Sequence, residues 1–384
     1  RVFAPPPVAG VRPPSWRTHA RRYGPAYLLL LPALATVAVW KYIPLGQGGV
    51  MAFYDYRLLG NSVFVGMEHF GNMLFDSFWW KSVCNAFRYS ALTMVLTFIP
   101  PVILAIMLQE IPVGKKIFRL IYYLPAVVSG LITMILWKQF YEPSEQGVLN
   151  ALLLRTPAWA FLMAGLLLFA LAAAFAERLR RQDAPGWALL FMLAGAALLY
   201  TCTRPALPVM FFPGETMGAA LRMAPSRLLS SATEPVRWLS NPDSAMFSCV
   251  IPMIWAGAGP GCLIYLAALQ CIPEEYYEAA DMDGAGFLDK ILFIALPHLK
   301  VLLIINFIGA FIASWYNAAG NILVMTGGAA NTEVAGLHIW YKAFTYLQFG
   351  PATAMAWMLG VILIGFTVQQ LAMLSRVEFK TMNS

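Results

Sequence analysis

The chain has 384 residues, of which 60% are hydrophobic and only 12% are charged. Soluble domains carry about 25% charged residues, so this composition excludes an ordinary soluble protein and indicates an integral membrane protein. The net charge of +7 is typical of Lys and Arg in cytoplasmic loops, not of a nucleic-acid-binding surface. The five cysteines lie mostly in or beside apolar segments without paired spacing, which indicates small buried side chains rather than a metal site.

Hydrophobic segments of membrane-spanning length recur along the chain. A helix needs about 20 apolar residues to cross the bilayer. Eight segments qualify, which predicts an all-α membrane protein, because barrel strands would be shorter and alternating. Residues 21–40 also resemble a signal peptide, but the apolar run continues past that length, so we expect a retained first helix. The eight segments are 25–46, 89–109, 119–137, 156–176, 184–203, 246–272, 301–325 and 352–375.

The distribution of Lys and Arg predicts the orientation of these helices. If the N-terminus is cytoplasmic, Lys and Arg are about twice as dense in the inside stretches as in the outside stretches. The loops VGKKIFR and ERLRRQD both favour this orientation. We therefore expect eight helices with both termini cytoplasmic. The segment 49–88 then lies outside, and its scattered aromatic residues are typical of an interfacial belt.

An acidic island lies between two of the predicted spans. Six of the nineteen Asp and Glu residues fall between Glu274 and Asp289. The predicted topology places the island in the cytoplasm. It could not lie in the bilayer, since each Asp at a helix centre costs about 2.5 to 3.5 kcal/mol. So much negative charge opposes the positive-inside trend, which favours a functional role. A surface helix that merely connects two spans is the alternative.

Local signals within the island predict a short helix followed by a turn. Pro273 suits the first helical position, and Glu274 and Glu275 follow in the first turn, where the helix dipole favours negative charge. Gly284 is a natural left-handed C-cap. A second helical run follows the turn, and Pro297 lies at the start of the next span. We therefore expect a helix–turn–helix elbow at the cytoplasmic face.

The stretch YEAADMDGAGFLDKILFIALP resembles the cytoplasmic signature of the permease subunits of binding-protein-dependent ABC importers. The family pattern is Glu-Ala-Ala, two residues, Asp-Gly-Ala, then an apolar run ending in Ile-x-x-Pro. Ile291 stands where the family usually has Phe, a mild departure. The residues in register are Glu278, Ala279, Ala280, Asp283, Gly284, Ala285, Ile294 and Pro297.

Further stretches extend this resemblance to all but about 85 residues of the chain. LVMTGGAANTEVAGLHIWYK is similar to the carbohydrate-uptake branch of the family, which usually has a third Gly and a Pro where Ala329 and Ala330 stand. We therefore expect a different conformation in this loop. The resemblance implies the transmembrane domain of a type I ABC importer, with a six-helix core that carries an inserted two-helix hairpin.

The insertion occupies residues 154–237. In relatives, the pieces that correspond to Gly147–Leu153 and Trp238–Ala245 follow each other closely. The insertion point faces outside, so an even number of spans is required, and two are present. We expect this hairpin to pack peripherally without lining the solute pathway, because its helices are almost wholly apolar. It could bind an accessory subunit or lipid, or simply add bulk.

Four regions follow from this division of the chain. The first is a cytoplasmic tail, and the second holds the first three core helices and the outside segment 49–88. The third is the inserted hairpin with an extracytoplasmic tail, and the last holds three core helices and the coupling elbow 273–297. Their bounds are 1–24, 25–153, 154–237 and 238–384.

The sequence lacks a Gly-x-x-x-x-Gly-Lys-(Ser/Thr) phosphate loop, so we do not expect the chain to be an enzyme that hydrolyses ATP. The family implies a second permease chain, an ATPase dimer that binds ATP and Mg, and an extracytoplasmic solute-binding protein, all at the bacterial plasma (inner) membrane. No cofactor or metal is expected on this chain. The residues expected to couple it to the ATPase are Glu278, Ala279, Ala280, Asp283, Gly284, Ala285 and Pro297.

Polar and aromatic groups near mid-membrane are candidates for contact with the solute. Aromatic faces and amides suit a sugar, although ordinary helix packing explains such residues equally well. A membrane-embedded enzyme and an ion-coupled secondary transporter are the alternatives, and both require intramembrane ionisable clusters that the sequence lacks. The sequence does not name the solute. The candidates are Trp255, Asn306, Trp315, Tyr316, Asn317 and Asn321.

Overall fold

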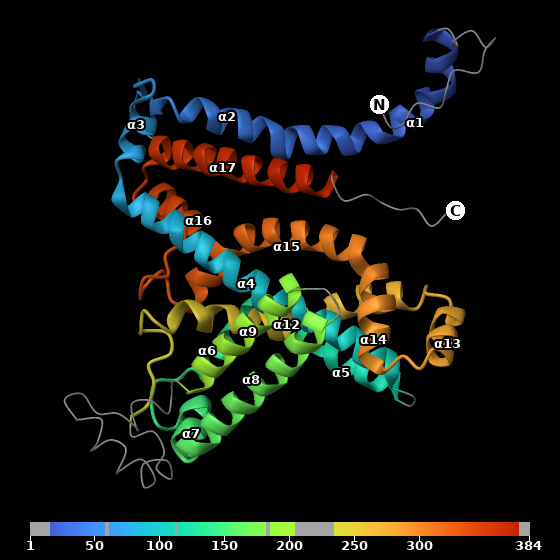
Figure 1. Cartoon of the computed structure of the whole chain (residues 1–384). Coiled ribbons are helices and arrows are strands. Elements are labelled where there is room, and N and C mark those ends of the chain that lie inside the picture. The colour runs from blue at the N-terminus through green and yellow to red at the C-terminus, as the bar shows by residue number, and fades with distance from the viewer. Residues whose placement is uncertain (1–15, 58–60, 112–113, 182–184, 204–233, 376–384) are drawn as a thin grey trace. The chain divides into compact units, whose positions relative to one another are not determined.

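The computed structural model is almost entirely helical (Figure 1). By its internal contacts the chain divides into two units, residues 1–79 with 339–365 and residues 80–338 with 366–384. The N-terminal tail up to residue 15 and residues 204–233 of the insertion lie outside the described part of the chain. The structure describes residues 16–57, 61–111, 114–181, 185–203 and 234–375.

The first unit begins with one long helical run that buries no side chain between residues 28 and 51. Its apolar residues are strongly exposed, as at Leu29 (81%) and Trp40 (78%). Such a surface requires lipid or another chain to cover it. The elements of this unit are α1 (Trp16–Val37), the π-helical turn η1 (Ala38–Tyr42), α2 (Ile43–Met51), the antiparallel strands β1 (Tyr54–Asp55) and β2 (Val63–Phe64), α3 (Glu68–Leu74), the π-helical turn η3 (Tyr341–Thr345) and most of α17 (Phe349–Ser375).

The second unit contains the helical core and the elbow. Buried polar side chains tie its helices together. Asn85 Nδ2 donates to the carbonyl of Glu333, and the hydroxyls of Ser90 and Ser314 lie 2.6 Å apart. Its elements are α4 (Ser77–Glu110), α5 (Lys115–Val127), α6 (Gly130–Phe140), α7 (Val148–Arg155), α8 (Ala158–Arg181), α9 (Pro185–Thr203), α12 (Ala245–Leu269), α13 (Glu274–Met282), α14 (Phe287–Lys290), the π-helical turn η2 (Ile291–Ala295), α15 (Leu296–Met325) and α16 (Ala335–Trp340).

Among the described residues, six helices are long and apolar enough to cross a membrane, or seven if the bent pair α5–α6 forms one span. Seven of the eight predicted segments fall within them. The eighth, 184–203, forms α9, whose described apolar stretch Phe191–Tyr200 is shorter than a span. Helix α4 begins at Ser77, so the end of the predicted outside segment 49–88 is helical.

The predicted span 119–137 is not one straight helix. It consists of α5 and α6, which meet at an angle of 94°. The bend lies at Val128 and Ser129, whose ψ angles of 133° and 139° are extended. Pro125 precedes them and lacks the N–H that a continuous helix needs, which weakens the last turn of α5. Hydropathy reports the apolar length of a segment and not its backbone angles, so the break was not predicted.

The two ends of the insertion meet at one buried side chain. Asn150 Nδ2 donates to the carbonyls of Glu142, Ser144 and Val236, at 3.1–3.2 Å. Its Oδ1 accepts from Val236 N (3.1 Å) and from the indole N–H of Trp238 (2.9 Å). Asn150 therefore joins the two ends of the segment predicted to be an insertion.

The inserted helices α8 and α9 pack closely as a hairpin (Figure 1). At Gly195 a Cβ atom would lie 2.6 Å from the Cβ of Ala172, so Gly195 permits close helix contact. The rings of Phe175 and Phe191 pack edge to face, with centroids 4.5 Å apart. Apolar side chains such as Leu167 (62% exposed) face outward, which is consistent with a peripheral, lipid-facing position.

Candidate coupling elbow and solute pathway

The first limb of the elbow, α13, ends in a Schellman motif. Gly284 has φ +74°, the left-handed conformation that favours glycine. The N–H of Ala285 donates to the carbonyl of Ala280 (2.9 Å), and that of Gly284 donates to the carbonyl of Asp281 (3.0 Å). This is the 6→1 and 5→2 pattern of the motif. The predicted C-cap at Gly284 is confirmed.

The start of α13 differs slightly from the prediction. Glu274 and Glu275 lie in the first turn, as predicted. Pro273 is the N-cap and not the first helical residue, since its ψ of 139° is extended. Glu274 therefore takes the first helical position. The difference is one residue, within the usual spread of helix boundaries.

The two limbs of the elbow are held against each other by charged side chains. Asp289 Oδ2 accepts from the N–H of Gly286 (2.9 Å) and so caps the start of α14. Lys290 Nζ lies 2.6 Å from Asp281 Oδ1, which joins α14 to α13. These contacts join the two limbs of the elbow.

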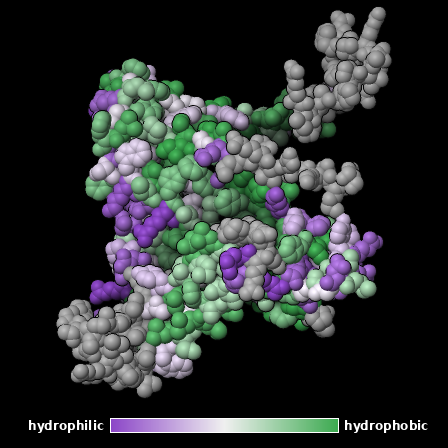
Figure 2. Space-filling view, in the orientation of Figure 1, coloured by the Kyte–Doolittle hydropathy of each residue, from purple (hydrophilic) through white to green (hydrophobic). Residues whose placement is uncertain are grey.

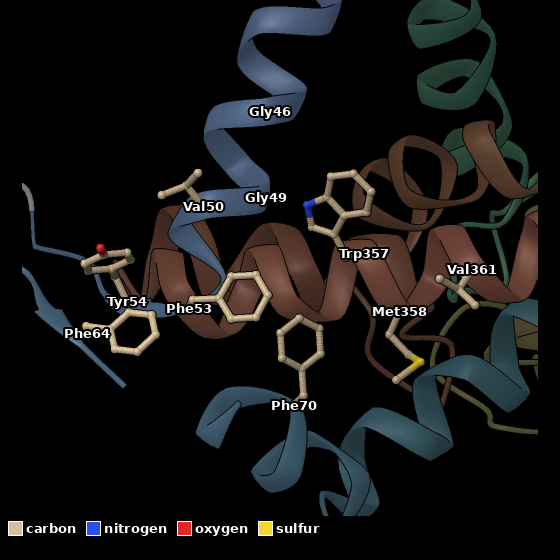
Figure 3. Close-up of a pocket in the computed structure, with 10 residues that line it drawn as sticks. All are labelled: Gly46, Gly49, Val50, Phe53, Tyr54, Phe64, Phe70, Trp357, Met358 and Val361. Atoms are coloured by element: carbon tan, nitrogen blue, oxygen red, sulfur yellow. The ribbon is translucent and has the colours of Figure 1, made fainter. Parts of the chain in front are cut away.

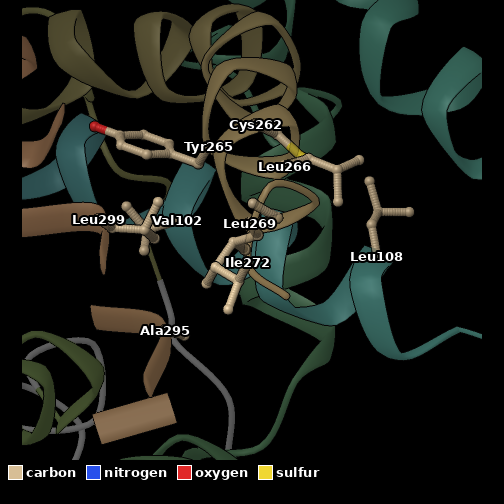
Figure 4. Packing of buried hydrophobic residues seen from close by; sticks show 10 residues of the cluster. Val102, Leu108, Cys262, Tyr265, Leu266, Leu269, Ile272, Ala295 and Leu299 are labelled. Carbon is tan, nitrogen blue, oxygen red and sulfur yellow. The ribbon is translucent and has the colours of Figure 1, made fainter. Parts of the chain in front are cut away.

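Both ends of the elbow are rooted in one buried apolar cluster (Figure 4). Ile272 precedes α13, while Ala295 and Leu299 follow α14. All three pack among buried residues of α4 and α12, such as Leu108 and Leu269. The hydroxyl of Tyr277 also accepts from the Gln109 amide of α4 at 3.4 Å. Both ends of the elbow are therefore in packing contact with two long helices.

The outer surface of α13 is open. The helix has no buried residue, and Figure 2 shows hydrophilic residues gathered over this side of the unit. Glu278, Ala279, Asp283 and Gly284 are exposed, while Ala280 and Ala285 are half-buried. Met282 is 89% exposed. Met282 was not among the predicted coupling residues, although its position as an apolar residue between Asp281 and Asp283 was an available signal.

Pro297 is the second residue of α15, the long helix of the next span, so the prediction that it lies at the start of this span is confirmed. It lies within a continuous helical run from Phe287 to Met325. The π-helical turn η2 immediately precedes it, and its extra residue relieves the clash that Pro makes with the preceding turn. His298 Nδ1 lies 2.7 Å from the carbonyl of Ile294 within the same stretch. The proline is thus accommodated by a bulge rather than by a helix end.

Three of the six solute-pathway candidates have partners within the chain. Trp315 is 7% exposed and packs edge to face on Phe87, with ring centroids 4.7 Å apart. The amide of Asn321 donates to the hydroxyl of Tyr89, and Asn306 lies near the hydroxyl of Tyr265. These contacts are those expected of helix packing.

The other three candidates are accessible. Tyr316 is 86% exposed and Trp255 is 44% exposed. Asn317 lies beside Tyr316 and is also exposed. Trp255 packs edge to face near Trp137 of α6, with centroids 6.5 Å apart. Two indoles, a phenol and an amide are thus available on the surfaces of α6, α12 and α15.

A separate apolar groove of about 640 Å³ lies in the first unit (Figure 3). Phe53, Tyr54 and Phe64 line it beside Phe70 of α3 and Trp357 of α17. Four aromatic residues of the 49–88 segment are therefore gathered around one groove. Its lining is mostly apolar, and the Tyr54 hydroxyl and the Trp357 indole N–H are the polar side-chain groups among the lining residues, fewer than a sugar site usually has.

A bundle of bent and proline-containing spans with an exposed, anchored elbow defines a membrane transport subunit rather than a receptor or an anchor. The family model of the binding-protein-dependent transport system inner membrane component matches residues 88–378. The chain belongs to this family.

Relatives and solved structures agree with this assignment. The probable ABC transporter permease protein YesP of Bacillus subtilis is 23% identical over 341 residues, which cover 88% of this chain and 85% of YesP. The arabinooligosaccharides transport system permease protein AraP of Halalkalibacterium halodurans is 26% identical over 291 residues, which cover 74% of this chain and 67% of AraP. The fold is similar to a bacterial ABC transporter involved in the import of the acidic polysaccharide alginate, with a TM-score of 0.66, 19% identity and coverage of 94% and 98% of the two chains.

The chain is therefore an inner-membrane permease subunit of an ABC importer that works with a binding protein. It has the type I fold predicted from its sequence. The ion-coupled transporter that stood as the alternative is not supported.

Proposed function

We propose that the chain imports a carbohydrate and that the exposed face of α13 is where an ATPase subunit docks. One observation carries the docking proposal: the outer face of α13 is open, while both ends of the elbow are packed into a buried cluster. Support also comes from Met282, an exposed apolar side chain suited to a pocket in a partner. Glu278 and Asp283 flank it with charges that fix the orientation of docking.

The elbow would then act as a lever. Closure of the ATPase dimer around ATP and Mg²⁺ would move α13, and the cluster at Ile272 and Leu299 would pass that movement to α4 and α12. Gly284 fixes the turn between the limbs, so its conformation sets the lever angle. Rigid-body movement of this kind is a common means of alternating access.

The carbohydrate proposal rests on the relatives and on the exposed candidates. Transport of arabinooligosaccharides is named for one relative, and trehalose and maltose for the permease MalF of Thermococcus litoralis. Trp255, Tyr316 and Asn317 supply aromatic faces and an amide, which are the groups that bind sugar rings and hydroxyls. We propose that these three contact the solute, with Asn306, Trp315 and Asn321 holding the helices beneath them.

The remaining partners follow from the same proposal. A second permease chain completes the pathway, and an ATPase dimer binds the nucleotide and metal, so this chain needs no cofactor of its own. A family matched as binding-protein-dependent requires a solute-binding protein outside the membrane. Both termini and the elbow would lie in the cytoplasm.

Co-purification of the chain with its neighbouring ATPase and permease tests the docking proposal. The test variant combines Gly284→Pro with Glu278→Lys, since proline cannot adopt the φ of +74° at Gly284. We expect this variant to lose the ATPase while it retains the second permease. Glu145→Lys, at an exposed position outside the elbow, is the matched charge control and should keep both partners. Retention of the ATPase by the test variant would reject α13 as the docking surface.

A further inference from the structure

The inserted hairpin contacts the second limb of the elbow. At the end of α8, Arg178 Nη2 donates to Asp289 Oδ1 at 2.7 Å. The Arg178 side chain is 41% exposed and that of Asp289 is 25% exposed, so water screens this ion pair only in part. The two residues are 111 positions apart in the chain, and they join the insertion to the signature of the family.

Asp289 stabilises the turn of the elbow together with Gly284. One of its carboxylate oxygens caps the N–H of Gly286, and the other accepts from Arg178. A charged donor on one oxygen orients the carboxylate and keeps the other oxygen aimed at the cap. Arg178 therefore acts on the elbow turn through Asp289.

An apolar contact accompanies the ion pair. Leu292 of η2 packs against a buried cluster formed by Ala176, Leu179 and Ala188, with Phe175 and Phe191 beside it. These residues belong to both helices of the hairpin. The hairpin thus holds the second limb by a charged contact and an apolar contact one turn apart, while α13 remains open.

We propose that the inserted hairpin is an intrachain brace for the coupling elbow, and that Arg178 is its positioning residue. The brace sets the position of α14 relative to the span that follows, and so determines how much of a displacement of α13 reaches the core. This inference rests on the proposed docking of the ATPase at α13. It assigns the insertion a role in coupling that a lipid-facing addition would not have.

The test measures MgATP hydrolysis by the whole complex in lipid nanodiscs. We expect Arg178→Ala to lower kcat about fivefold, the size of effect that loss of one such contact produces, with KM for ATP unchanged. Arg180→Ala is the matched control, because Arg180 pairs with Glu177 of its own helix (2.8 Å) and is on the same turn of α8. It should leave kcat unchanged. Arg178→Lys keeps the positive charge and should restore part of the activity.

A double-mutant cycle separates the brace from a general loss of stability. In the Asp289→Asn background, Arg178→Ala should produce no further decrease, since the charged partner is already absent. An equal decrease in both backgrounds, or an Arg178→Ala complex with wild-type kcat, would overturn the proposal. The amount of ATPase that co-purifies is measured in parallel. If the docking proposal is wrong, the Gly284→Pro, Glu278→Lys variant retains the ATPase in co-purification. If only the brace proposal is wrong, co-purification is unaffected and the difference appears in kcat alone.

Discussion

Gly284 and Ala330 both have the left-handed backbone conformation, which glycine adopts without strain and alanine does not. Gly284 has φ +74° and no atom within 4 Å of the place where a Cβ would lie, so conformation alone requires glycine there. Ala330 has φ +52°, in the loop where relatives of the carbohydrate branch carry Gly and Pro. A Cβ atom at this φ strains the backbone of the loop. The loop is held by hydrogen bonds of the Thr332 hydroxyl. This hydroxyl lies 2.6 Å from the Thr326 hydroxyl and donates to the carbonyl of Ala329 at 2.6 Å.

Ala330→Gly should stabilise the protein by up to about 1 kcal/mol, because glycine adopts positive φ without the steric cost that alanine has. The midpoint of thermal unfolding in detergent measures the effect. Ala329→Gly is the matched control, since Ala329 is not among the positive-φ residues, and it should be neutral or slightly destabilising. A lower unfolding temperature for Ala330→Gly would show that the strain is compensated elsewhere.

Asn150→Ala should destabilise the second unit by about 2 to 4 kcal/mol, since this buried side chain would lose its three donated and two accepted hydrogen bonds. Asn241→Ala is the control, because Asn241 is exposed and its Oδ1 accepts from the N–H of Asp243, two residues on. Unfolding in increasing denaturant compares the two variants. Equal unfolding midpoints would mean that the ends of the insertion are held by other contacts.

At the scale of elements, glycine determines how closely two spans cross. At Gly259 of α12, a Cβ atom would clash with the carbonyl of Tyr122 in α5. Tyr122 lies three residues before Pro125, in the helix that ends at the bend between α5 and α6. Gly257 lies two residues earlier in α12, and a Cβ atom there would have no heavy atom within 4 Å.

Gly259→Ala should push α5 away from α12 and lower stability by about 1 to 3 kcal/mol, the usual cost of overpacking. Gly257→Ala should have no such effect and is favoured slightly by the higher helix propensity of alanine. The yield of folded protein by size-exclusion chromatography and its unfolding midpoint check both. If the two variants behave alike, the close crossing does not exist in the membrane.

At the scale of the whole molecule, local rules predicted the elbow and hydropathy predicted the spans. The cap at Gly284 and the acidic first turn of α13 depend on neighbours in sequence, so sequence analysis placed them within one residue. Hydropathy did not predict the bend at Val128, although Pro125, three residues before it, is a local signal for a helix break. The contact of Arg178 with Asp289 was also missed, since no local signal joins two residues 111 positions apart.

Replacement of residues 156–234 by a short Gly-Ser linker should leave assembly intact, because Asn150 would still join α7 to Val236 and Trp238. Loss of the brace should lower ATP hydrolysis to the level of Arg178→Ala. Co-purification of the ATPase and second permease, followed by kinetic measurement, tests both statements. Failure of the shortened chain to assemble would make the insertion part of the scaffold itself.

The contacts of Asn150 also constrain the order of folding. Its partners Val236 and Trp238 lie 86 and 88 residues later in the chain, so this junction cannot close until the whole insertion has been synthesised. The entropic cost of closing a loop rises with its length. Helices α8 and α9 pair with each other first, since their contacts are closer in sequence, and this shortens the remaining loop. The Asn150 junction can therefore form only after both helices of the hairpin have been synthesised.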